Sequence, residues 1–167
     1  MPSPEIVAKL GPEWLRTAAH EAGHAVIAAV QGIPVDHARV WYVGSGQSTY
    51  VRGVMHPGRE RRGAGLVGSQ RADAELVMAL AGPAAEVAWL RHAERMRAGA
   101  AEHTTEHMWD GDIHNARKAL RAGATLTLSQ GRAQARMLVR AHWRGIERTA
   151  AQLARRGYIA GPSVRVS

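Results

Sequence analysis

Apolar residues recur every three or four positions along most of the chain, a pattern typical of helices that bury one face. The pattern predicts four helices, over Glu13–Gln31, Ala72–Arg97, Asp112–Arg121 and Ser129–Arg155. We expect the second helix to break or kink at Pro83, because proline lacks an N–H and clashes with the preceding turn.

The last helix has the clearest boundaries in the sequence. Ser129 is a suitable N-cap and Gly157 a suitable stop at the C-terminal end. Its apolar face, at helical spacing, consists of Val139, Trp143, Ile146, Ala150 and Leu153. These positions predict a helix that packs on the core.

Two short segments, Ala38–Val43 and Tyr50–Met55, are rich in β-branched and aromatic residues and flank a turn-forming stretch, so they predict paired strands. Residues 56–71 predict a long loop, and long loops in compact domains are usually mobile or functional. Residues 1–12 hold three prolines and predict an irregular N-terminal arm. We therefore expect a mainly α (α+β) fold, with residues 13–167 forming a single domain.

The composition of this 167-residue chain limits the kinds of active site and partner that we expect. There is no cysteine, which excludes disulfides, a thiolate nucleophile and cysteine-ligated zinc, so a bound metal must use His, Asp or Glu. The net charge is +8, but aromatic residues make up only 5% and no base-reading motif is visible, so nucleic acid is not the expected partner. The most apolar stretch, residues 22–30, is too short to span a membrane, and a cytoplasmic protein is expected.

The most specific motif is His20-Glu21-Ala22-Gly23-His24, an H-E-x-x-H pattern inside the first predicted helix. Residues four apart lie one turn apart on the same helix face, so His20 and His24 can bind one zinc ion. Glu21 lies beside them and can take a proton from a water that the zinc acidifies. Gly23 has no side chain to obstruct a ligand that crosses the site. The spacing therefore predicts a catalytic zinc site.

A catalytic zinc needs a third protein ligand, and two residues compete for that role. Glu86 lies on the second predicted helix, and Asp112 lies at the start of the third. An exposed helix face would also account for Glu86, and a favourable interaction with the helix dipole would account for Asp112. Spacing alone leaves the choice open.

A second motif, His103-Thr104-Thr105-Glu106-His107, has the inverted H-x-x-E-H pattern. The surrounding residues show little apolar periodicity, so the evidence for a helix is weaker here. We expect His103 and His107 to be surface or lid residues rather than metal ligands.

HEAGH is followed by two predicted strands, by LAGPAAE on a helix, by GDIHNARKA, and by a long helix that ends in GYIAGPSV. This order of motifs resembles the peptidase domain of the FtsH-type AAA zinc metalloproteases. The resemblance covers about residues 13–165. It implies that Asp112 is the third zinc ligand and that Glu86 is structural or supports a ligand.

The resemblance implies a zinc-dependent metalloendopeptidase with one Zn²⁺ per chain and Glu21 as the catalytic residue. Substrates would be proteins or peptides, held as an added strand beside Tyr50–Met55. The family's ATPase and membrane helices have no counterpart in these 167 residues, so we expect ATP-independent activity and a possible separate ATPase or adaptor. The alternative is a catalytically silent peptidase-like module that binds a protein partner.

Overall fold

The computed structural model describes residues 4–45, 50–59, 65–105 and 110–166. It confirms the expected mainly helical fold with a small antiparallel sheet. In chain order the elements are α1 (Pro4–Val30), β1 (Val35–Val43), β2 (Tyr50–Pro57), α2 (Gly68–Ala93), α3 (Ala98–Thr105), α4 (Asp110–Arg121), α5 (Leu128–Ala141), α6 (Trp143–Arg156), β3 (Tyr158–Ala160) and a short 3-10 turn (Gly161–Ser163).

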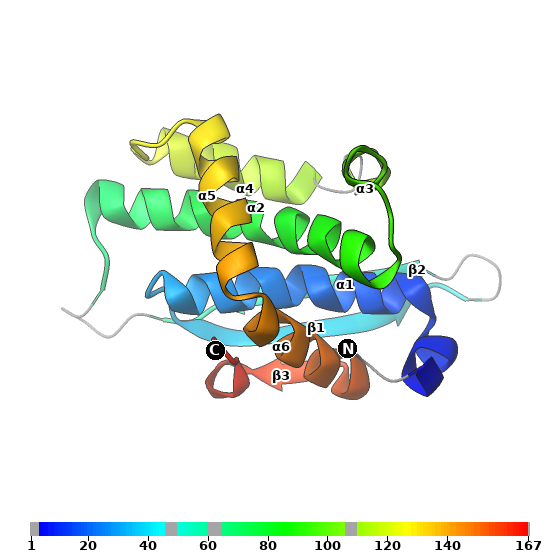
Figure 1. Cartoon of the computed structure of the whole chain (residues 1–167). Coiled ribbons are helices and arrows are strands. Elements are labelled where there is room, and N and C mark those ends of the chain that lie inside the picture. Colours follow the sequence, from blue (N-terminus) through cyan, green and yellow to red (C-terminus); the bar gives the residue numbers. More distant parts are fainter. Residues whose placement is uncertain (1–3, 46–49, 60–64, 106–109, 167) are drawn as a thin grey trace.

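Helix α1 is the centre of the structure, as Figure 1 shows. Helix α2 packs along one side of α1, while the sheet and α6 pack against its other sides. Helices α4 and α5 also pack against α2, and α5 runs across it towards α6 in Figure 1. Because α1 is enclosed by these elements, its middle turns are buried from Ala18 to Ala28, apart from half-buried His20.

The N-terminal residues differ from the irregular arm that the prolines predict. Residues 4–10 are helical, and a break at Gly11 separates them from the rest of α1. Gly11 has a φ of 75° and a ψ of 158°, which ends the first helical segment. Pro12 follows it at the start of the second segment, where its missing N–H costs nothing. The predicted helix start near residue 13 is thus confirmed.

Helix α2 is unbroken at Pro83, so the prediction of a break there is wrong. The helix is held on both sides of the proline, because α1, α4 and α5 all pack against it. The predicted loop 56–71 is also shorter than expected, since β2 extends to Pro57 and α2 begins at Gly68.

The sheet has three antiparallel strands in the order β2-β1-β3. The predicted pairing of the first two strands is confirmed, with Val40 opposite Gly53 and Val43 opposite Tyr50. Strand β3 was not expected, since three residues carry too little pattern to identify a strand. It pairs with β1 beyond the end of α6, with Ala38 opposite Ile159.

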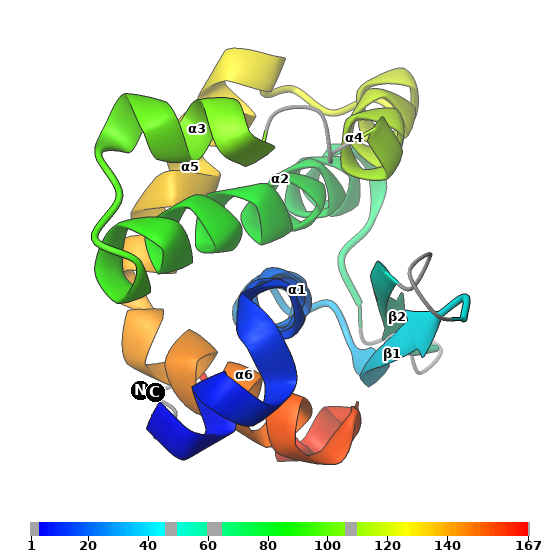
Figure 2. The ribbon, with the colours of Figure 1, turned by 90° about the vertical axis from the view of Figure 1, so that its right-hand side faces the viewer.

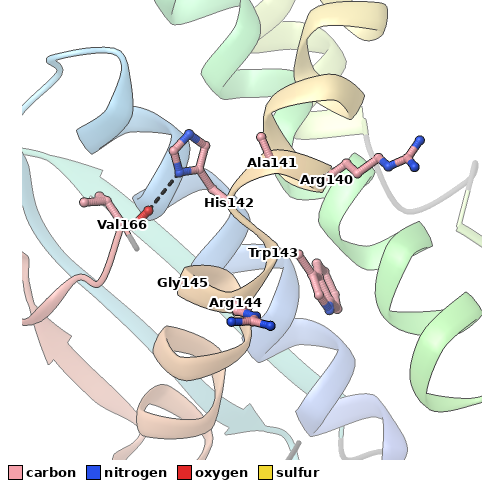
Figure 3. Close-up of a pocket in the computed structure, with 7 residues that line it drawn as sticks. All are labelled: Arg140, Ala141, His142, Trp143, Arg144, Gly145 and Val166. Carbon is pink, nitrogen blue, oxygen red and sulfur yellow. Dashed lines mark hydrogen bonds between the residues drawn. The ribbon is translucent and has the colours of Figure 1, made fainter.

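The last predicted helix is two helices, α5 and α6, which meet at His142. The C-terminal segment explains the break, because the Nδ1–H of His142 donates a 2.8 Å hydrogen bond to the Val166 carbonyl (Figure 3). A Cβ at Gly145 would collide with the Arg165 carbonyl, so the segment lies directly on the junction. The N-cap is Thr127 rather than Ser129, in a capping box with Gln130. Gly157, at φ 68°, ends α6 as predicted.

Among the described helices, none combines the length and apolar character that a membrane crossing requires.

Asp73 of α2 fixes the connection between α4 and α5. Its carboxylate accepts hydrogen bonds from the backbone N–H groups of Thr125 (2.7 Å) and Leu126 (2.9 Å) and from the Thr125 hydroxyl (2.6 Å). Burial acts to raise the pKa of Asp73, but these hydrogen bonds outweigh it and hold the pKa below the ordinary 3.8. The ionised carboxylate therefore stabilises the fold.

We predict that Asp73→Ala lowers the free energy of unfolding by about 1–2 kcal/mol at pH 7, because donors in the α4–α5 connection lose their acceptor. Because the pKa of Asp73 is lower in the folded state than its ordinary value, the ionised carboxylate stabilises the folded protein at pH values above the ordinary pKa. This stabilisation is lost as the pH falls through the lower, folded-state pKa. The difference between parent and variant should therefore shrink in acid. Urea unfolding from pH 7 to pH 2 measures it, and a difference independent of pH would contradict the assignment.

Candidate metal centre

Helices α1 and α4 bring three potential metal ligands together. His20 and His24 lie one turn apart on α1, and their Nε2 atoms are 3.0 Å apart. Asp112, in the first turn of α4, places Oδ2 3.0 Å from His20 Nε2 and Oδ1 3.1 Å from His24 Nε2. In the described part of the chain, this is the one group of three or more such residues with ligand atoms within 4.8 Å of one another.

The geometry fits a zinc ion. Tetrahedral zinc lies ~2.0–2.1 Å from nitrogen and oxygen ligands, so its ligand atoms are about 3.3 Å apart. The two Nε2 atoms are 3.0 Å apart, and each lies 3.0–3.1 Å from a different oxygen of Asp112, so these separations are within a few tenths of an ångström of that value. Two imidazoles and one carboxylate are also the ligand types of catalytic zinc sites, in which the fourth position stays open.

The other ring nitrogens of both histidines are hydrogen-bonded away from the cluster. His20 Nδ1 donates to Glu86 Oε2 at 2.9 Å, and His24 Nδ1 donates to the Met78 carbonyl at 2.8 Å. Because the proton of a neutral imidazole is held on Nδ1 in this way, its Nε2 lone pair remains available to a metal. Both rings are therefore fixed in the orientation and tautomer that a metal ligand needs.

The structure gives Asp112 and Glu86 different positions. Asp112 lies among the candidate ligand atoms, whereas Glu86 contacts the far side of the His20 ring. Glu86 is buried, and its Oε1 lies 3.1 Å from the Nε of Arg16. Arg16 was not identified from the sequence, since only the fold brings it to a carboxylate 70 positions away. A carboxylate held in this way orients His20 and strengthens it as a ligand.

Glu21 lies between the histidines and strand β2. Its side chain is only 6% exposed, and a Cβ at Gly53 would lie 2.5 Å from its Oε1. Gly53 therefore allows β2 to pass directly over the Glu21 carboxylate. This glycine was not singled out from the sequence, and its only signal is an interruption of a strand-forming segment.

Two further glycines allow α1 and α2 to approach closely. A Cβ at Gly23 would lie 2.5 Å from the Cβ of Ala85 and 2.7 Å from the Ala81 carbonyl oxygen. Gly23 therefore allows the two helices to pack closely. The sequence suggested instead that Gly23 leaves room for a ligand, but the space beside it is filled by α2. A Cβ at Gly82 would lie 2.7 Å from His20 Nε2 and still closer to the ring of His24.

The cluster is electrostatically coupled. Burial lowers the pKa values of His20 and His24, but the nearby Asp112 reverses this and both pKa values are raised. Burial also acts to raise the pKa of Asp112, yet the two imidazoles hold it well below its usual range. The pKa of Glu21 is raised, chiefly by burial. The carboxylate of Asp112 thus supplies the negative charge that a divalent cation needs.

The cluster is partly accessible to solvent. The side chains of His20 and Asp112 are 14% and 15% exposed, whereas Glu86 on the opposite side of the ring is buried. Figure 2 shows α4 and strands β1 and β2 on the same side of α1 and α2.

The inverted motif contributes nothing to this cluster in the described part of the chain. His103 is exposed on α3 and is not among the grouped ligands. Glu106 and His107 lie outside the described residues.

No family model matches the chain, and no curated protein matches it at a significant level.

We predict that Gly82→Ala abolishes tight zinc binding, because the added methyl group would occupy the space between the two imidazoles and α2. Alanine favours the helix, so α2 itself should persist. Gly111→Ala is the matched control, since a Cβ at that position of α4 meets no atom within 4 Å. Zinc content after gel filtration checks both, and a full equivalent of zinc in Gly82→Ala would contradict the geometry.

We also predict that Glu86→Gln weakens zinc binding by about 10- to 100-fold, the typical effect of losing a carboxylate that orients a histidine ligand. The stoichiometry should remain one ion per chain, because no ligand atom is removed. Competition with a chromogenic chelator measures the affinity. An unchanged dissociation constant would show that Glu86 does not act through His20.

Proposed function

We propose that this chain is a zinc-dependent metalloendopeptidase. The observation that carries the proposal is the cluster of His20, His24 and Asp112, with both histidine Nδ1 atoms engaged elsewhere and Glu21 beside them. A zinc ion bound there would polarise a peptide carbonyl and acidify a water molecule. His20, His24 and Asp112 would hold the ion, which leaves Glu21 for proton transfer.

Glu21 would act as general base and then as general acid. Glu21 is not among the grouped ligand residues, and its carboxylate lies under β2 near both imidazoles. In this role it accepts a proton from the attacking water and delivers that proton to the amine that leaves. Its burial keeps bulk water away from the carboxylate during the transfer.

Strand β2 offers a place for an extended substrate. It forms one edge of the sheet, because the strand order is β2-β1-β3. A peptide that adds to this edge gains backbone hydrogen bonds whatever its sequence. Gly53 of β2 abuts Glu21, so a peptide along this edge passes close to the catalytic carboxylate.

The order of motifs along the chain, which resembles that of the FtsH-type peptidase domain, supports the same proposal. Peptide-bond hydrolysis by these residues consumes no nucleotide. A separate ATPase or adaptor would serve to deliver folded substrates rather than to perform the chemistry. The competing proposal, a silent module that only binds a partner, assigns no role to Glu21 as a base.

We predict that Glu21→Gln retains one zinc per chain and lowers the rate of peptide hydrolysis by about 10²- to 10⁴-fold, the usual contribution of a general base. Glutamine has nearly the same size, so the buried position should remain filled. Glu94→Gln, at an exposed residue after α2, is the matched control and should keep full activity. Turnover of unfolded casein and zinc content are measured together. Equal turnover in parent and Glu21→Gln would contradict the proposal.

A further inference from the structure

The outward face of the sheet carries arginine side chains beside the edge of β2. Ala38 and Val40 of β1 are buried towards the helices, and Gly53 of β2 faces Glu21 on the same side. Because successive strand residues point to opposite faces, Arg52 lies on the other face, where it is exposed. Its guanidinium carbon is 6.0 Å from the centre of the Tyr50 ring.

Arg52 has no acidic partner among the residues that the structure describes. Its direct cross-strand partner is Trp41. Arg39, one strand further in, lies 4.5 Å above the centre of the Trp41 ring. Arg52 therefore lies on the edge strand itself, and Arg39 is a similar cation one strand away from that edge.

A peptide added to the edge of β2 would place one of its side chains directly beside Arg52. Side chains of directly opposite residues in neighbouring strands have Cβ atoms about 4.5–5.5 Å apart and point to the same face. An Asp or Glu at that position would meet the guanidinium, while a Lys or Arg would be repelled. The neighbouring substrate residue lies opposite Gly53, and hence close to Glu21.

We propose that Arg52 determines specificity, so that the preferred substrates are peptides with an acidic residue at the position that pairs with it. This inference rests on the proposed peptidase function and on docking at the β2 edge. Exposed ion pairs are modest, so the expected preference for Glu over Lys is about fivefold in kcat/KM. Salt should reduce it, because both charges are exposed to solvent.

The test uses zinc-loaded protein and a set of fluorogenic peptides with a neutral sequence. A single Glu or a single Lys is moved through every position on either side of the cleavage point. The parent should show one position where Glu raises kcat/KM and Lys lowers it. Arg52→Glu should reverse the preference at that position alone, and Arg52→Lys should retain it. Arg39→Glu, the matched control on β1, should behave as the parent does.

The possible failures are distinguishable. If the parent cleaves the peptides with no charge preference at any position, the inference is wrong and the peptidase proposal stands. The same holds if Arg52→Glu keeps the parent's preference or if Arg39→Glu reverses it. If zinc-loaded parent cleaves none of the peptides and no unfolded protein, the peptidase proposal fails and the inference fails with it.

Discussion

The close approach of α1 and α2 is the constraint on which the candidate site depends. Gly23 meets the backbone and Cβ atoms of α2 without room for a side chain, so the two helices are in direct backbone contact at this point. This close approach lets α2 groups reach the far nitrogens of both histidines on α1, through Glu86 and the Met78 carbonyl. A larger residue at position 23 would separate these pairs and leave the imidazoles free to rotate.

The same packing explains what the sequence could and could not predict. The spacing of His20 and His24 depends only on helix geometry, so their shared face was predictable, as were the main helices and the β1–β2 pairing. The choice between Asp112 and Glu86 depends on how α2 and α4 pack on α1. The spacing of residues along the sequence carries no information about that packing. The break at His142 and strand β3 also follow from tertiary contacts, since each depends on a distant segment.

Helices and sheet contribute different parts of the proposed chemistry. Helices α1 and α4 supply the candidate ligands, α2 supplies Glu86 and the Met78 carbonyl that hold the two imidazoles, and β2 supplies an edge beside them. The glycine at position 53 connects the two, because it lets the strand lie against the carboxylate of Glu21. In the proposed peptidase, backbone hydrogen bonds would position a substrate along this edge, and the reaction would take place at the helix face below.

The central claim is that His20, His24 and Asp112 form one catalytic zinc site with an open position. X-ray absorption at the zinc edge of the loaded protein tests it directly. The account predicts four nitrogen or oxygen neighbours at ~2.0–2.1 Å, with outer-shell scattering from two imidazoles, reduced to one imidazole in His24→Ala. Three or four imidazoles around the zinc, or a spectrum unchanged in His24→Ala, would contradict it.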